Sequence, residues 1–156
     1  MFIRTKRRCT VVMNIGLAVL AALWISNYYR LAAVSGRLME PTLSQGDIVV
    51  VKMRRLPQRG DIVVIDSKAL HKRIIKRVIA VEGDTVFVSA GEIWINGEAL
   101  TEEYIKEPFE HDKGFWVVPP GSVYVLGDNR NRSRDSRGGW FHSNGGSNRN
   151  RNLPGE

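Results

Sequence analysis

The chain has 156 residues, and 43% of them are hydrophobic, which is enough for the core of one domain with an additional tail or anchor. Its formal net charge of +7 is compatible with an anionic membrane surface, a nucleic acid or an acidic partner. The single cysteine, Cys9, excludes an intrachain disulfide.

The first predicted element is a membrane anchor. Residues 10–29 contain no charged side chain, and a helix of about 20 residues matches the hydrocarbon thickness of a bilayer. Four basic residues precede this run: Arg4, Lys6, Arg7 and Arg8. Because basic flanks stay in the cytoplasm, we expect a single-pass protein with residues 1–9 cytoplasmic and the chain after Arg30 on the outer face of the cell membrane. A cleaved signal peptide is the alternative, since residues 30–36 contain small side chains that suit a cleavage site.

The body of the chain is predicted to be mainly β. Short β-branched runs, such as residues 61–66 and 73–81, are separated by polar turns. Asn96-Gly97 is a strong signal for a tight hairpin turn of type I′. Long helical periodicity does not occur after the anchor, so we expect an antiparallel curved-sheet or barrel-like domain over residues 30–139.

The last segment, residues 140–156, is rich in Gly, Asn and Arg and has little to bury. We therefore predict a disordered polar tail. Segments of this composition also occur in proteins that bind nucleic acid, but a domain outside the membrane does not meet nucleic acid, and we expect no such partner.

The three histidines are His71, His111 and His142. They lack the spacing of metal ligands and have no cysteine partner, and a Ser-His-Asp triad has no supporting context. We expect exposed histidines, no metal and no cofactor.

Lys76 lies in the middle of a predicted strand, next to Arg77. Side chains alternate across a strand, so these two residues face opposite sides and one of them points inward. Burial would lower the pKa of a lysine and make it a candidate general base. A solvated lysine at a sheet edge is the alternative, and the residues alone leave the choice open.

Residues 127–139, with the sequence GDNRNRSRDSRGG, are dense in hydrogen-bonding side chains directly after an apolar run. Asp128 and Asp135 are expected to pair with Arg130 and Arg137, which would hold a rigid loop beside a site. The alternative is a solvated basic loop.

Three motifs follow the anchor in order: G-x-x-M-x-P-T-L at residues 36–43, K-R-V-I-A-V-x-G-D at residues 76–84 and G-D-N-R-x-x-S-x-D-S-R at residues 127–137. From the anchor through Gly139, this order resembles the bacterial type I signal peptidases, also called leader peptidases. The resemblance implies a largely β catalytic domain on a membrane anchor, which hydrolyses secretory preproteins after small residues at the outer face of the membrane. It also implies a serine nucleophile and a neutral lysine as the general base.

Carried over to this chain, the resemblance makes Lys76 the general base and Ser133 the residue that orients it. The position of the nucleophilic serine is occupied by Leu38. Supporting positions are Gly36, Asp128, Asn129, Arg130, Asp135 and Arg137, and substrate-binding positions are Met39 and Pro41.

Leu38 has no nucleophilic atom, so covalent catalysis cannot proceed through it. We do not expect Ser35 or Ser44 to reach the same point. The chain is therefore expected to be a membrane-anchored signal peptidase I family protein that meets secretory preproteins at the bilayer but is catalytically impaired. A non-catalytic factor that binds preproteins or pilins in the old substrate groove is the alternative. The chain after Gly139 also departs from the family pattern, and we expect the closing strand of the domain to be missing.

Overall fold

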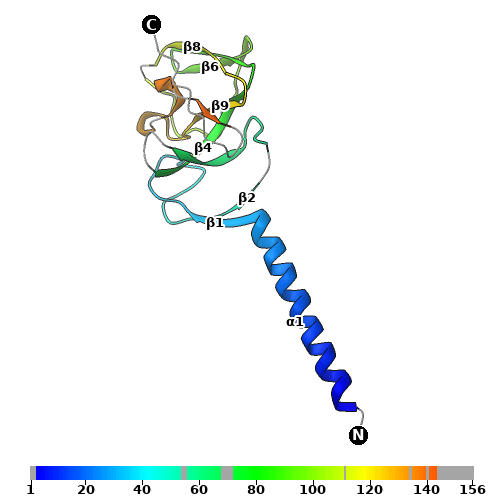
Figure 1. Cartoon of the computed structure of the whole chain (residues 1–156). Coiled ribbons are helices and arrows are strands. Elements are labelled where there is room, and N and C mark those ends of the chain that lie inside the picture. Colours follow the sequence, from blue (N-terminus) through cyan, green and yellow to red (C-terminus); the bar gives the residue numbers. More distant parts are fainter. Residues whose placement is uncertain are drawn as a thin grey trace. The chain divides into compact units, whose positions relative to one another are not determined.

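The computed structural model describes residues 3–53, 56–67, 72–110, 112–133, 135–139 and 141–143. By its contacts the chain divides into two compact units. The first is formed by Met1–Ala32 with Val50–Arg55, and the second by Ala33–Val49 with Leu56–Glu156. Figure 1 follows the chain through both units in sequence colours.

The first unit contains the predicted anchor. Helix α1 spans Ile3–Tyr28, and its segment Thr10–Tyr28 is 19 residues long, apolar enough to cross a membrane and not buried. At a rise of 1.5 Å per residue this segment measures about 28 Å, close to the hydrocarbon thickness of a bilayer. The predicted anchor ends at Tyr29, whereas this residue begins strand β1, Tyr29–Ala33, which pairs with β2, Ile48–Lys52.

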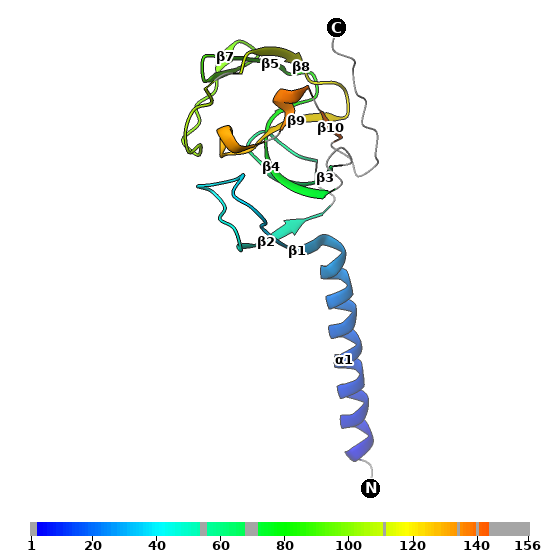
Figure 2. The same ribbon diagram turned by 90° about the vertical axis from the view of Figure 1, so that its left-hand side faces the viewer.

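The second unit is built on two antiparallel four-stranded sheets, which lie one above the other in Figure 2. The first sheet has the order β10-β9-β4-β3, and its strands are β3 Ile62–Ser67, β4 Lys72–Val81, β9 Ser122–Leu126 and β10 His142–Ser143. The second has the order β7-β6-β5-β8, and its strands are β5 Thr85–Ser89, β6 Glu92–Ile95, β7 Glu98–Ala99 and β8 Gly114–Val117. Two 3-10 turns follow β9, namely η1 Arg130–Arg132 and η2 Ser136–Gly138. The prediction of a mainly β, antiparallel domain is confirmed.

The main hydrophobic core draws side chains from both sheets. Its buried members are Ile79, Ala80, Val86, Val88, Ile93, Ile95, Phe109, Val118, Tyr124 and Leu126. The alternation of β5 supplies Val86 and Val88 to this core and leaves Phe87 outside, as a half-buried strand requires. Asn96 and Gly97 have φ values of 55° and 86°, as the predicted type I′ hairpin turn demands.

The position of strand β4 in its sheet determines whether the Lys76 side chain is buried. The strand lies between β9 and β3, so it is not an edge of the sheet. A bulge shifts its pairing with β9 between Val78 and Ala80, and Lys76 and Val78 share one face before the bulge. That face carries a smaller buried cluster of Val78, Val123 and Val125. Lys76 is 0% exposed, which rules out a solvated lysine at a sheet edge.

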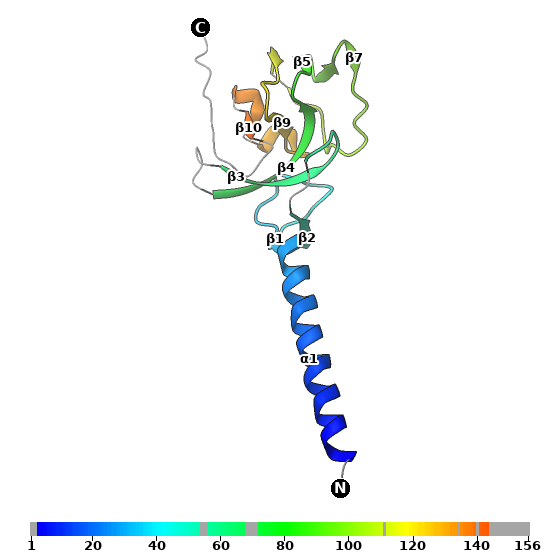
Figure 3. The ribbon, with the colours of Figure 1, turned by 45° about the vertical axis from the view of Figure 1, so that its right-hand side comes forward.

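The chain after Gly139 continues the fold over its described residues. Phe141 packs against Tyr124 with ring centroids 6.3 Å apart, and β10 pairs with β9 through His142↔Val123, as Figure 3 shows for the two strands. Residues 141–143 therefore pack onto the domain, and the predicted disordered tail does not include them. Strand β10 is only two residues long, so the prediction that the closing strand of the domain is missing stays a prediction.

His142 is another correction, because the side chain predicted to be exposed is buried next to the hydrophobic cluster of β9. A polar residue in a short edge strand gives no local signal of burial. His71, His111 and residues 144–156 lie outside the described residues, so the predictions made for them stay predictions.

Candidate active site

The segment between β1 and β2, residues 34–47, forms a closed loop that we call the 34–47 loop. The Val34 amide donates to the Asp47 carbonyl at 2.8 Å, and the Gly46 amide donates back to the Val34 carbonyl at 2.9 Å. Gly36 has a φ of 87°, a left-handed conformation that favours glycine. Glycine at position 36 thus has a local conformational reason, and its supporting role in the site stays a prediction.

The side chains of the 34–47 loop divide into anchors and exposed groups. Met39 is 2% exposed, so its side chain anchors the loop and is not offered to a ligand. The substrate-binding assignment of Met39 is not supported by this placement. Pro41 is exposed and Leu38 is half-buried.

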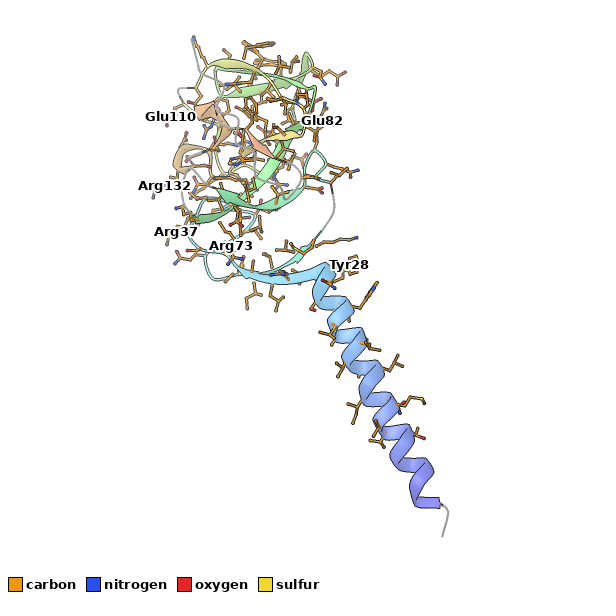
Figure 4. The ribbon with its side chains drawn as sticks, in the orientation of Figure 1. Tyr28, Arg37, Arg73, Glu82, Glu110 and Arg132 are labelled. Atoms are coloured by element: carbon orange, nitrogen blue, oxygen red, sulfur yellow. The ribbon has the colours of Figure 1, made fainter. Side chains whose placement is uncertain are left out.

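The segment after β9, residues 127–137, holds the 34–47 loop by its backbone, and we call it the 127–137 box. Asn129 makes two contacts with the loop backbone: its amide donates to the Leu38 carbonyl at 3.1 Å, and its Nδ2 donates to the Arg37 carbonyl at 3.0 Å. Figure 4 labels Arg37 on the loop and Arg132 on η1, both with exposed side chains. The position of residue 38 is thus fixed without the use of its side chain.

Gly127 marks the point at which the loop, the box and the base meet. A Cβ built at this position would lie less than 3.0 Å from both the Ser133 Oγ and the Leu38 carbonyl oxygen. Only glycine leaves this space free. Because both oxygens border the same small volume, Leu38 and Ser133 are close neighbours in the structure.

Lys76 reaches the same place from β4. Its Nζ donates a hydrogen bond to the Ser133 Oγ at 2.5 Å. Burial lowers the pKa of Lys76 from its ordinary value of 10.5 to about 8; the carboxylate of Asp135 opposes this shift and the guanidinium of Arg137 adds to it. A lysine in this setting loses its proton close to neutral pH, as a general base must.

Arg137 stabilises the box through ion pairs and hydrogen bonds. Its Nε lies 2.8 Å from Asp135 Oδ1 and its Nη1 lies 2.5 Å from Asp112 Oδ2, so the predicted Asp135–Arg137 pair is confirmed. Its Nη2 donates to the carbonyls of Arg130 at 2.7 Å and Ser133 at 3.2 Å. One half-buried guanidinium thus fixes the backbone at both ends of η1.

The second predicted pair, Asp128 with Arg130, is wrong. Asp128 accepts from Arg77 Nη2 at 2.7 Å and from Thr42 Oγ1 at 2.5 Å. Arg130 turns to Glu102, which accepts from its Nη1 at 2.8 Å and its Nη2 at 2.5 Å. Arg77 faces the side of β4 opposite Lys76, so the strand supplies a buried lysine on one face and an ion pair on the other.

The segment from Glu102 to Asp112 was not predicted to belong to the site. Tyr104 lies with its ring centroid 3.9 Å from the Arg77 guanidinium carbon, and its hydroxyl donates to Glu102 at 2.7 Å. Burial and the neighbouring carboxylate raise the pKa of Tyr104. Glu102 and Arg130 are 28 residues apart, so the sequence gives no local sign that they pair. The acidic character of the segment, which could complement the basic box, is a weak signal of this contact. Among the described residues, no group of three or more His, Cys, Asp or Glu could hold a metal ion.

Comparison with known proteins gives the family of this chain. The family model described as "Signal peptidase, peptidase S26" matches residues 7–150. The chain belongs to this family. The matched residues include Lys76, the 34–47 loop and the 127–137 box.

The relatives agree with this membership. A signal peptidase I of Leptolyngbya laminosa is 38% identical over 138 residues, which are 80% of this chain and 68% of that protein. A probable signal peptidase I-2 of Synechocystis sp. is 38% identical over 130 residues, which are 76% of this chain and 60% of that protein. The chain therefore spans about two thirds or less of the length of these two relatives. A crystal structure of a signal peptidase I from Enterococcus faecalis V583 has 33% sequence identity and a TM-score of 0.47, and the match covers 53% of this chain and 86% of that one.

Proposed function

We propose that this signal peptidase family chain is anchored in the cell membrane by α1, with residues 1–9 in the cytoplasm and the β domain on the outer face. There it binds preproteins that carry signal peptides, but its cleavage of them is impaired because Leu38 stands at the nucleophile position. The named relatives are signal peptidases, and the apolar, exposed segment Thr10–Tyr28 has the length of a membrane span.

One observation carries this proposal: the base side of the site is complete, while residue 38 has no hydroxyl. Lys76 is fully buried, and its Nζ bonds Ser133 at 2.5 Å. The Leu38 carbonyl borders the same space at Gly127 and is held there by Asn129. A loop held in this way presents residue 38 to the base whatever its side chain is.

The missing step is nucleophilic attack. A serine hydroxyl at position 38 would give its proton to neutral Lys76 and its oxygen to the scissile carbonyl carbon. Leucine can do neither. The backbone amide of residue 38 remains available as a donor to a carbonyl oxygen, so substrate binding without cleavage is chemically reasonable.

The decisive experiment restores the hydroxyl. Purified Leu38→Ser protein is expected to cleave a preprotein after Ala-x-Ala, weakly but measurably, while the unaltered chain leaves it intact. The double variant Leu38→Ser/Lys76→Ala should be inactive, and the matched control Leu38→Ser/Ser44→Ala should keep the activity. Preprotein cleavage by the unaltered chain at the rate of the Leu38→Ser variant would refute the impairment.

A non-catalytic binding or assembly factor for preproteins or pilins is the second candidate. A buried lysine without a partner lowers the stability of a protein. A chain that only binds preproteins would have no catalytic reason to keep such a lysine. The hydrogen bond from Lys76 to Ser133 reduces that cost and removes the objection. Unchanged preprotein binding by a well-folded Leu38→Ser protein that still does not cleave would favour this candidate.

The proposed topology has its own test. Protease added to spheroplasts is expected to digest the chain after Arg30, because the basic cluster at Arg4 to Arg8 keeps the N-terminus in the cytoplasm. Protection of the β domain in intact spheroplasts, with digestion after lysis, would show that the domain lies in the cytoplasm.

A further inference from the structure

We propose that Ser133 is itself a nucleophile in this chain. Lys76 activates the Ser133 hydroxyl toward small activated esters, which acylate the Ser133 oxygen and are then released by water. This activity is separate from the preprotein cleavage discussed above, which depends on residue 38. Ser133 would then act as a catalytic residue in addition to orienting the lysine.

The contact between base and hydroxyl is the first argument. Ser133 Oγ lies 2.5 Å from Lys76 Nζ, within the distance at which a base takes a proton from a nucleophile. Within the described part of the chain, no other hydroxyl bonds to Lys76, and Leu38 brings none to the same space. The serine–lysine pair that is absent at residue 38 is therefore present at Ser133.

The second argument is that Ser133 is rigid and partly open. It ends the 3-10 turn η1, and its carbonyl is held by Arg137 at 3.2 Å. Arg137 is fixed in turn by Asp135 and Asp112. Ser133 is half-buried while Lys76 is fully buried, so the serine residue is more accessible to solvent than the lysine. A nucleophile needs this combination of fixed geometry and access.

The third argument concerns the proton. A pKa of about 8 leaves a usable fraction of Lys76 neutral at pH 7 and most of it neutral above pH 8. The charges that act on Lys76 come from its own strand and from the box, and His142 adds a titratable group on β10. These groups are Lys72, Asp128, Asp135, Arg137 and His142. Burial and the nearby charge of Lys76 lower the pKa of His142, so this imidazole is neutral in the range in which Lys76 titrates.

The chemical step balances without any further reactant. The Ser133 oxygen forms a bond to the carbonyl carbon of p-nitrophenyl acetate, and the ester C–O bond breaks to release p-nitrophenolate. The hydroxyl proton passes to Lys76 Nζ, which gives an acetyl-serine and an ammonium. Water then hydrolyses the acetyl-serine to acetate and restores the serine hydroxyl, and the Lys76 ammonium releases its proton to solvent.

The experiment treats the full chain in detergent with p-nitrophenyl acetate, quenches it in acid and maps the acetyl group by mass spectrometry. We expect the acetyl group on Ser133, with a labelling rate that rises as the pH increases through about 8. Removal of the base in Lys76→Ala should slow labelling by about 100-fold, the usual contribution of general base catalysis. The matched control Ser44→Ala should label at the unaltered rate, because Ser44 is an exposed serine on the 34–47 loop.

Three results would overturn the proposal: an acetyl group on Lys76 in place of Ser133, no acetyl group on either residue, or Ser133 labelling that persists in Lys76→Ala. Mapping on the unaltered chain does not depend on the folding of any variant. The outcome is also distinct from the preprotein test, because Ser133 can be acetylated by a chain that leaves preproteins intact. Loss of Ser133 labelling would leave the impairment at Leu38 unaffected.

Discussion

The 127–137 box and the 34–47 loop face each other across the candidate site, but they are held in place by different forces. The box depends on buried charges, since Asp128, Arg130 and Asp135 are all at most 5% exposed and all paired. The loop is anchored by buried Val34 and Met39 and is bound to the box through backbone carbonyls. A side chain on the loop that is not one of these anchors, such as half-buried Leu38, can therefore change without loss of the fold, whereas a buried charge in the box cannot. This difference explains how the hydrogen bond between Lys76 and Ser133 can coexist with leucine at position 38.

The largest expected effect is the removal of a charge from the box. Asp128→Ala removes the fully buried carboxylate of the pair and leaves half-buried Arg77 without its partner, and should lower the free energy of unfolding by about 3–5 kcal/mol. The matched change on the loop is Glu40→Ala. Glu40 forms an ion pair with the exposed Lys106, with 3.6 Å between the charged atoms. It should cost about 0–1 kcal/mol. Denaturant unfolding of both variants measures the two losses in the free energy of unfolding. Equal losses would mean that buried charges contribute no more to the box than surface ion pairs contribute to the loop.

The next effect is the pH dependence that Lys76 gives to stability. Its pKa is about 8 in the folded chain and 10.5 ordinarily, so the unfolded chain holds the proton more tightly. Stability relative to a Lys76→Met variant should therefore rise between pH 8 and pH 10.5, by on the order of 3 kcal/mol, and be flat below that window. Urea unfolding of both proteins across this range provides the measurement. A difference that does not change with pH would show that Lys76 is not desolvated.

A smaller effect is expected where loop and box touch. Gly127→Ala would drive a methyl group into the Ser133 hydroxyl and the Leu38 carbonyl, and should destabilise the chain by about 1–3 kcal/mol. Gly138→Ala is the control, because a Cβ there meets nothing within 4 Å, and we expect a change within about 0.5 kcal/mol. Thermal unfolding compares the two variants. Similar melting temperatures would mean that the close approach at Gly127 relaxes at no cost.

The smallest effect tests the hydrogen bond that the Thr42 side chain on the loop donates to Asp128 in the box. Thr42→Val keeps the shape of the side chain but removes the hydroxyl that donates to Asp128, and should cost about 1 kcal/mol. Thr101→Val, at an exposed threonine, serves as the control and should be near neutral. If Thr42→Val lowers the free energy of unfolding as much as Asp128→Ala does, Asp128 stabilises the chain mainly through Thr42 and not through Arg77.

Several features of the site could be predicted because they are encoded locally. The alternation of β4 places Lys76 and Arg77 on opposite faces, and the short spacing between Asp135 and Arg137 made their pair predictable. The partner of Asp128 could not be predicted, because Arg77 reaches it from a strand 51 residues away, while nearby Arg130 is drawn to Glu102. Sequence distance favours the wrong arginine here, and the fold brings the right one closer.

The sequence by itself determined the apolar helix, the antiparallel strands, the Asn96-Gly97 hairpin and the absence of a nucleophilic atom at Leu38. Each of these follows from hydropathy, alternation, turn conformation or the chemistry of a single side chain, all of which act over a few residues. Only the tertiary structure decided that Lys76 is the inward residue of its pair, that it bonds Ser133, and that His142 is buried on β10. Burial and ion pairing depend on which strands become neighbours in the sheet, and β4, β9 and β10 become neighbours only once the whole domain has folded.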